Sequence, residues 1–566
     1  MKLVLKNGYV FDPINGIDGE KMDIFIEDGR IVEEVKGEAE VIDCSGMVVM
    51  PGGVEIHSHI AGGKVNTARL MRPEDHLRNV SPRTAITRSV CGYSTPSTFL
   101  TGYAYSKLGY TTAFTAALPP LMARHTHEEL HDIPMLDKGA LTVMGNNWLV
   151  MRYLSEGRIE HACAYVAWLL RATKGYAIKA VNPGGSEAWG WGRDVRSLSD
   201  RVPHFDITPR EIISGLMEIN ERLSLPHSLH LHPNNLGRVG NVSTTLETLE
   251  LTREVKPSRE RQVLQLTHAQ FHSYGGDSWR NFSSAAESIA EAVNSSDRLV
   301  LDMGQVVFGD TTTMTADGPM EYYLSSLTGL KWANKDIELE TAPGVTPFVY
   351  SEKSPVSGVQ WAIGLELALL VREPMKVMLT TDHPNGAPFF TYPKIIGWLM
   401  SARSRERVLN SLHPQAQRNT VLGSLDREYT FQEICWVTRA AQAKSLGLEN
   451  KGHLGAGADA DVAVYPVNPE ETDPSREYEK VERAFSATAY TVKAGEVVVR
   501  NGEVVRVVSG RTLYVDARVD GELEREVLAD VDYYFKRFYS VNLANYPVQE
   551  VYLTSPQAVK VDAGVR

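Results

Sequence analysis

Cysteine is scarce in this chain: there are only four in 566 residues, and no two of them form a Cys-x-x-Cys pair. Closely spaced cysteine thiolates hold iron–sulfur clusters and zinc ribbons, so we expect neither kind of site here. Isolated cysteines are more often small buried apolar residues. We therefore expect the four to be reduced and buried; they are Cys44, Cys91, Cys163 and Cys435.

Long apolar runs and an excess of basic residues are also missing. No stretch approaches the roughly 18 apolar residues that a membrane span requires. The segment Met-Lys-Leu-Val-Leu-Lys-Asn-Gly at the start resembles a strand and a turn, without the apolar core and cleavage site of a signal peptide. The formal net charge of −12 disfavours nucleic acid or an anionic membrane as the main partner. We therefore expect a cytoplasmic protein that binds neither.

The hydrophobic pattern divides the chain into a long central region and two β-rich ends. From about residue 50 to 425, short apolar strands alternate with longer helical patterns, which is typical of βα units in a parallel barrel. The candidate strands are 54–59, 111–115, 177–181, 228–232, 263–268, 299–302 and 377–382, and a helix is expected over 431–446, with Gly447 to end it. Short strands with turn signals lie within 3–34 and again within 461–508. Sheets this small need partners, so the two ends are expected to join in one β-sandwich.

We therefore predict an α/β fold, a (β/α)8 TIM-like barrel carrying a β-sandwich formed by the N- and C-terminal segments. The length of 566 residues exceeds what one core supports, which also favours several domains. The predicted parts are 1–50, the first part of the sandwich; 51–425, the barrel; 426–510, a helix and the second part of the sandwich; and 511–566, a C-terminal extension.

Two histidines one residue apart, His57 and His59, follow an apolar strand and a Pro-Gly-Gly turn. Residues i and i+2 of a strand point to the same side, so the two imidazoles can grip one metal ion. The carboxyl ends of barrel strands form the catalytic face of such folds. The pair therefore indicates a metal site there.

Further candidate ligands lie inside or at the ends of later predicted strands: Lys179, His230 or His232, His268 and Asp382. Imidazoles and carboxylates suit Zn²⁺, and two metal ions need more ligands than the first pair offers. Lys179 has apolar neighbours on its strand, and burial favours the neutral amine that captures CO₂ as a bridging carbamate. His230 and His232 face the same way, so only one of them need be a ligand.

The segment Arg124-His125-Thr126-His127-Glu128-Glu129, with His131, imitates the His-Glu-x-x-His metal motif. Pro134 follows soon afterwards and argues against the long helix on which that motif is built. We interpret the segment as a substrate or loop site before a metal site.

The order His-x-His, Lys, His, His, Asp resembles the amidohydrolase superfamily with a binuclear metal centre. Within it, the chain closely resembles the amidohydrolase-type subunits of formylmethanofuran dehydrogenases, and the likeness covers nearly its whole length. The stretches that carry it include His57-Ser-His-Ile-Ala-Gly-Gly-Lys-Val-Asn66, Pro96-Ser-Thr-Phe-Leu-Thr-Gly-Tyr103, Arg171-Ala-Thr-Lys-Gly-Tyr176, Glu187-Ala-Trp-Gly-Trp191 and Thr312-Thr-Met-Thr-Ala-Asp-Gly-Pro-Met-Glu321.

The resemblance implies two divalent metal ions, with zinc as the expected metal, and an N6-carboxylated Lys179. The implied metal-binding positions are His57, His59, Lys179, His232, His268 and Asp382, and Asp382 is also the expected catalytic acid and base. His232 is preferred to His230 because His232-Pro-Asn-Asn235 falls where the family's ligand begins a similar string. The expected substrate-binding residues are Arg124, His125, His127 and Asn234. An insertion around 310–350 is expected to shape the substrate pocket.

The implied function is the interconversion of formate plus methanofuran and N-formylmethanofuran, in a complex that reduces CO₂ to formate at another subunit. That redox step needs partner subunits with a tungsten or molybdenum pterin and iron–sulfur clusters, because this chain lacks the cysteines. One alternative is the hydrolytic subunit of a formyltransferase/hydrolase complex. Another is a stand-alone cyclic amidase of the hydantoinase or dihydroorotase type. A scaffold subunit with a dead site is disfavoured because every ligand position is kept.

Overall fold

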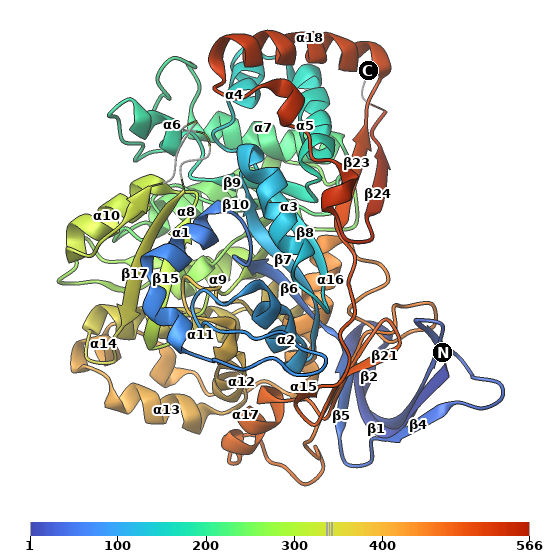
Figure 1. The fold of residues 1–566 in the computed structure, drawn as a ribbon. Helices are drawn as coiled ribbons and strands as arrows, with labels where there is room; N and C mark the ends of the chain where they lie inside the picture. The colour runs from blue at the N-terminus through green and yellow to red at the C-terminus, as the bar shows by residue number, and fades with distance from the viewer. Residues whose placement is uncertain (1, 335–337, 339, 341–342, 565–566) are drawn as a thin grey trace.

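A barrel of eight parallel strands forms the centre of the computed structural model, which describes residues 2–334, 338, 340 and 343–564 (Figure 1). The sheet order is β18-β14-β11-β10-β9-β8-β7-β6. A parallel bridge between Ser58 and His383, beside a 2.7 Å hydrogen bond from the His59 N–H to the His383 carbonyl, joins the first and last strands. The strands are β6 (Gly53–Ser58), β7 (Tyr110–Leu118), β8 (Asp137–Val143), β9 (Ala177–Val181), β10 (Leu229–His232), β11 (Leu264–Leu266), β14 (Leu299–Asp302) and β18 (Val377–Met378).

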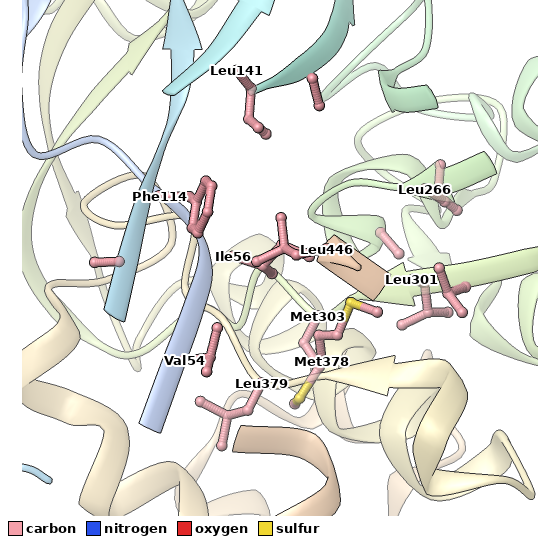
Figure 2. Close-up of a cluster of buried hydrophobic side chains, with 14 of the residues drawn as sticks. Val54, Ile56, Phe114, Leu141, Leu266, Leu301, Met303, Met378, Leu379 and Leu446 are labelled. Atoms are coloured by element: carbon pink, nitrogen blue, oxygen red, sulfur yellow. The ribbon is translucent and has the colours of Figure 1, made fainter. Parts of the chain in front are cut away.

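The barrel confirms the predicted fold class. All of its strands except β8 lie on segments that the sequence indicated. The barrel strands are buried on both faces, which is why they read as nearly continuous apolar runs. Side chains such as Val54, Phe114, Leu266 and Met378 fill part of the interior as a packed apolar cluster (Figure 2).

Helices connect the strands and cover the barrel, with local signals that fix their ends. For example, Thr208 and Glu211 form a capping box at the start of α7, with Pro209 at the first helical position. The main helices are α1 (Gly63–Met71), α2 (Thr98–Lys107), α3 (Ala123–His131), α4 (Trp148–Ser155), α5 (Ile159–Thr173), α6 (Gly185–Gly190), α7 (Pro209–Arg222), α8 (Val242–Glu250), α9 (Ala286–Asn294), α11 (Pro355–Leu370), α12 (Tyr392–Met400), α13 (Ala402–Ser411), α14 (Pro414–Arg418) and α17 (Tyr478–Ser486).

A second sheet of nine strands combines both ends of the chain, as predicted. Its path runs β22-β21-β20-β19-β5-β1-β2-β3, with β4 paired to β1, and β5 and β19 join the two ends antiparallel. Its apolar core contains Leu3 and Ile26 from one end and Val462 and Val492 from the other. The strands are β1 (Lys2–Asp12), β2 (Ile17–Glu27), β3 (Arg30–Val32), β4 (Glu40–Asp43), β5 (Val48–Pro51), β19 (Val462–Tyr465), β20 (Tyr490–Lys493), β21 (Glu496–Arg500) and β22 (Glu503–Val504).

An insertion between β14 and β18 lies against the barrel and contains β15 (Gly309–Thr315), α10 (Gly318–Thr328), β16 (Ala333–Asn334) and β17 (Gly344–Tyr350). It falls in the predicted segment 310–350, of which residues 335–337, 339 and 341–342 lie outside the described residues. The predicted helix over 431–446 is formed by α15 (Phe431–Cys435), a π-helical turn (Trp436–Ala440) and α16 (Ala441–Leu446). Gly447 ends it with φ +67°.

The C-terminal extension contains β23 (Leu513–Arg518), α18 (Gly521–Phe538) and β24 (Gln557–Asp562). It packs beside α4 and α5 (Figure 1), where Arg171 binds Glu524 and the Tyr153 hydroxyl donates to Asp530 at 2.8 Å. The boundaries at 50, 425 and 510 stay a prediction. In the part of the chain that the structure describes, no helix has the length and apolarity to cross a bilayer. All four cysteines are free; Cys91 is half-buried and the others are buried.

Candidate metal centre

Three predicted ligands meet where β6 and β18 end. The His57 Nε2 and His59 Nε2 atoms lie 2.9 and 3.0 Å from the same carboxylate oxygen, Oδ1 of Asp382. The closing contact between Ser58 and His383 brings them together, because it aligns the two neighbouring strands side by side. The structure therefore brings the His57–His59 pair and Asp382 together.

A second group stands beside the first and consists of His232, His268 and His272. Each offers a ring nitrogen within 4.8 Å of the others. His232 ends β10 and His268 follows β11, so both again lie at carboxyl ends of barrel strands. The rings of His57 and His268 have centroids 5.1 Å apart, so the two groups form one continuous cluster.

Lys179 lies within β9, and its side chain is almost fully buried. Its Nζ donates a hydrogen bond to Thr267 Oγ1 at 3.4 Å. Burial lowers the pKa of its amine to about 7, against the opposing attraction of Asp382 and Asp302. A large fraction of this amine is therefore neutral near pH 7, which is the form that reacts with CO₂.

The donor atoms fit a metal centre because several buried ones lack any other partner. Among the described residues, His57 Nε2, His59 Nδ1, His268 Nδ1 and Asp382 Oδ1 make no hydrogen bond. Burial lowers the pKa of His59 and of His268 well below the usual range, so their rings are neutral. Burial alone would raise the pKa of Asp382, but the His268 and His57 rings hold it well below its usual range. Neutral imidazoles beside a carboxylate are the state that divalent metal ions bind.

Two of these residues are held in an uncommon backbone conformation. His268 has φ +34° and Asp382 has φ +51°, in the left-handed region that costs free energy for residues other than glycine. Gly304 makes room for the first of them, because a Cβ at that glycine would lie 2.5 Å from the His268 Cβ. Strain of this kind at a cluster of titratable groups is typical of a functional site.

His230 and His232 have different surroundings, which bears on the choice that the residue pattern left open. Both ring nitrogens of His230 are engaged, by His57 Nδ1 at 2.9 Å and by His227 Nε2 at 3.0 Å. Among the described residues, His232 has a hydrogen-bond partner only at Nε2, which lies 3.2 Å from Asp317 Oδ2. The geometry therefore favours His232 as the ligand, through Nδ1, with the carboxylate fixing the ring.

Asp317 belongs to a buried polar network that includes Asn234. The Asn234 amide donates to Asn182 Oδ1 at 2.8 Å, and the Asn182 amide donates to Asp317 Oδ1 at 3.0 Å. Asp317 also caps α10 by accepting from the Met320 N–H. Through Asp317, the insertion therefore contacts His232, a ligand of the proposed centre. Asn234 does not contact His232 in this network but helps to orient Asn182, which binds Asp317.

A cavity of about 340 Å³ opens on the cluster, with His232, His268 and Asp382 in its wall. The rest of the lining is mainly apolar and aromatic and includes Phe271, Tyr274, Trp279, Met320, Phe348 and Tyr350. Met320, Phe348 and Tyr350 come from the insertion, as the sequence predicted for the pocket. A concave apolar site with a few polar groups at one end is typical of a small-molecule site.

Two further ionisable side chains are buried close by. Lys64 has an amine without a hydrogen-bond partner among the described residues, and burial lowers its pKa to about 7. Glu321 uses only one of its oxygens in a hydrogen bond, 2.9 Å from Thr313 Oγ1, and burial raises its pKa to about 8. Both groups sense the charge of Asp382, so both belong to its electrostatic surroundings.

The 124–131 segment lies in α3, a helix of nine residues, and not in a loop, although the helix is short, ending three residues before Pro134. Arg124 stacks on Tyr552 on the outside, and His125 Nε2 lies 2.6 Å from the Asn66 amide. His127 is buried, with Nε2 2.9 Å from the Thr173 carbonyl. None of the three lines the cavity described above. Their role in substrate binding stays a prediction.

Sequence reasoning missed several residues of the cluster. Asp302 ends a strand that the sequence indicated, and its Oδ1 accepts the His268 N–H at 2.8 Å. His272 follows His268 by four residues, a spacing that could have drawn attention to it. Asp317 and Lys64 gave no local signal, because only the tertiary fold brings them to the site.

Comparison with known proteins agrees with this geometry. A model described as the amidohydrolase family matches residues 40–499. The chain belongs to the amidohydrolase family. Protein FwdA of Methanocaldococcus jannaschii is 56% identical over 570 residues, covering 100% of this chain and 99% of that protein. FhcA, from the formyltransferase/hydrolase complex of Methylorubrum extorquens, is 38% identical over 529 residues, covering 92% of each chain.

A solved structure extends this similarity to three dimensions. It is the crystal structure of the Methylorubrum extorquens formyltransferase/hydrolase complex FhcABCD with methylofuran. The matched chain has a TM-score of 0.88 and 36% identity, with 99% of this chain and 100% of that one covered. The chain is thus a metal-dependent hydrolase by family, and the relatives described above match it over 92% or more of their own length.

Proposed function

We propose that this chain is the amidohydrolase subunit of a formylmethanofuran dehydrogenase, interconverting N-formylmethanofuran with formate and methanofuran. The observation that carries the proposal is the convergence of five candidate ligands, three of which line the cavity; they are His57, His59, His232, His268 and Asp382. The full-length likeness to FwdA, and to a protein solved in a complex with methylofuran, supports the choice of substrate. The aromatic wall of the cavity suits a furan ring and its linker.

The proposed cofactors are two divalent metal ions, zinc being our expectation from the ligand set. His57 and His59 would hold one ion, His232 and His268 the other, and Asp382 lies against the first pair. The neutral, buried Lys179 amine supports carboxylation to a carbamate that bridges the two.

The bound ions would supply Lewis acidity toward the formyl oxygen and lower the pKa of a water molecule. Asp382 would accept one proton of the attacking water as the water oxygen bonds to the formyl carbon. Asp382 would then return that proton to the nitrogen as the C–N bond breaks, which gives the free amine and formic acid, and the acid releases its remaining proton to become formate. The same steps in reverse condense formate with methanofuran.

Partner subunits are part of the proposal. The four cysteines are dispersed and mostly buried, so this chain offers no cysteine cluster for an iron–sulfur centre. Formate would therefore come from a partner carrying a tungsten or molybdenum pterin and iron–sulfur clusters, in the cytoplasm. The rival is the hydrolytic subunit of a formyltransferase/hydrolase complex, which has the same chemistry without the redox step.

Purification of the native complex tests the proposal directly. We expect hydrolysis of N-formylmethanofuran, about two metal ions per chain by elemental analysis, and redox subunits identified by mass spectrometry. Partners without redox centres would favour the formyltransferase/hydrolase alternative. Activity that persists in protein with no metal would overturn the binuclear site.

Lys179→Ala tests the proposed carbamate. The variant should lose metal and activity, and a short carboxylic acid should partly restore both by replacing the missing bridge. Lys376→Ala is the matched control, since Lys376 is similarly buried but binds Glu373 and the Ser296 carbonyl away from the cluster. Full metal content in Lys179→Ala would refute the bridge.

A further inference from the structure

A chain of three buried histidines leads from α16 to the metal centre. His227 Nδ1 lies 2.6 Å from the Ser445 carbonyl oxygen, and His227 Nε2 lies 3.0 Å from His230 Nδ1. His230 Nε2 in turn lies 2.9 Å from His57 Nδ1. All three rings are fully buried. His227 and His230 have no place in the proposed chemistry, so their arrangement calls for another role.

The carbonyl at the far end fixes the direction of every hydrogen bond in this chain. A carbonyl oxygen only accepts, so His227 must carry its proton on Nδ1 and present a lone pair at Nε2. His230 must then donate from Nδ1 and accept at Nε2. His57 must therefore donate from Nδ1. The opposite direction would require an extra proton on a fully buried ring, which is unfavourable.

Asp302 supports the same outcome from another strand. Its Oδ2 atom lies 3.5 Å from His57 Nδ1 and can only accept when the carboxyl is ionised. Its Oδ1 atom already accepts the His268 N–H and the Thr380 hydroxyl. The two acceptors near His57 Nδ1 are His230 Nε2 and Asp302 Oδ2, and both require a proton on that nitrogen. The other ring nitrogen of His57, Nε2, lies 2.9 Å from Asp382 Oδ1, on the side of the proposed metal ion.

We propose that His227 and His230 are positioning residues that lock His57 in the Nδ1–H form, leaving its Nε2 lone pair ready for the metal ion. In this arrangement the first ligand is set for binding before the metal arrives. Here the Ser445 carbonyl sets the tautomer of His57 through the imidazoles of His227 and His230. For a metal-bound histidine, a single carboxylate or carbonyl commonly sets the tautomer directly. The inference rests on the proposed metal site.

The decisive variant is at His227, which touches neither metal nor substrate. His227→Leu removes the donor and acceptor, whereas His227→Gln can donate its amide to the Ser445 carbonyl and accept from His230 with its oxygen. We expect His227→Leu to weaken binding of one of the two metals by about 10- to 100-fold, as for other outer partners of ligating histidines. His227→Gln should restore most of that affinity.

The control is His161→Gln, which changes a half-buried histidine of α5 paired with Glu526 at the surface. It should bind metal as the parent protein does. Metal content is measured after equilibration with a competing chelator, and thermal unfolding is recorded for each variant. Unchanged metal affinity in His227→Leu would overturn the proposal, and so would a Gln variant as weak as the Leu variant.

Neutron diffraction of the metal-free protein after exchange into D₂O provides a measurement independent of folding and activity. Deuterium is expected on Nδ1, and not on Nε2, of His227 and His230, and on Nδ1 of His57. Deuterium on Nε2 of His230, or none on Nδ1 of His57, would overturn the proposed lock. If the parent protein bound no metal yet showed this pattern, the proposed function would fail while the histidine chain stood.

Discussion

Asp317→Asn is the substitution that best tests how the insertion supports the metal centre. The Asp317 carboxylate accepts from three donors. Its Oδ2 faces His232 Nε2 at 3.2 Å, and its Oδ1 accepts from the Asn182 amide at 3.0 Å and from the Met320 N–H at 3.2 Å. An asparagine has one accepting oxygen and one donating amide, so it can serve the donors on only one of these two sides. Asn182 cannot turn its oxygen toward the new amide without losing its bond from Asn234.

The expected magnitude follows from that single lost bond. Leaving a buried donor without a partner costs about 1–3 kcal/mol. If His232 is the residue that loses its acceptor, this corresponds to metal binding weaker by roughly 10- to 100-fold, which is also typical of removing the outer partner of a ligating histidine. Asparagine is nearly isosteric, so the cavity should keep its shape.

Metal affinity measured by chelator competition is the assay, with thermal unfolding as a check on folding. Asp310→Asn is the matched control, because Asp310 belongs to the same insertion but forms half-exposed ion pairs with Arg72 and Arg78. It should leave metal affinity unchanged. If Asp317→Asn bound both metals as tightly as the parent protein, the carboxylate would not be orienting His232 and the reasoning would be wrong.

Four other predictions follow from the site and its supports. Asp382→Asn should slow hydrolysis by about 10²- to 10⁴-fold, since the amide cannot carry the proton, and near-normal rates with both metals bound would exclude Asp382 as the acid and base. Gly304→Ala should lower metal content and melting temperature. The new Cβ would lie 2.5 Å from the Cβ of His268, and position 304 has a φ of +61°, which favours glycine. Burial lowers the pKa of Lys179 to about 7, so its amine is neutral above that pH and protonated below it. Reactivation of metal-free enzyme by metal and bicarbonate should therefore succeed near pH 8 and fail near pH 6. Equal yields of active enzyme at the two pH values would contradict this prediction. Lys451→Met should destabilise the protein by about 3–5 kcal/mol in denaturant unfolding while leaving metal affinity intact, because it leaves the buried carboxylates of Asp137 and Asp461 without this partner.

The barrel and its ligand-bearing strands were predictable because their signals are local. Apolar runs mark the strands. A polar residue at the carboxyl end of a barrel strand lies on the catalytic face, independently of the helices that connect the strands. The sheet that joins the two ends was predictable for a similar reason, since short strands cannot remain unpaired. β8 was missed because Asp137, Lys138 and Gly139 interrupt its apolar pattern. Those polar residues are buried against the second sheet and the extension, which the sequence alone does not reveal.

The choice between His230 and His232 shows where local reasoning stops. Both lie on one face of one strand, so alternation cannot separate them, and the resemblance to a family favoured His232. The structure adds the physical distinction: His230 engages both nitrogens, with His57 and His227, whereas His232 engages one, with Asp317. In sequence, His57 lies 173 residues from His230, and Asp317 lies 85 residues from His232. No spacing rule predicts contacts between residues so far apart.

The insertion links metal binding to substrate choice. Asp317 begins α10 and orients His232, while Met320 on the same helix lines the cavity. Glu321, the next residue, is buried within the electrostatic reach of Asp382. A change that moves α10 to admit a different substrate would therefore also disturb a metal ligand. Because one short helix serves both purposes, substitutions that alter the cavity wall on α10 should be accompanied by changes in metal affinity. Equal changes at Tyr274, a lining residue outside the insertion, should not.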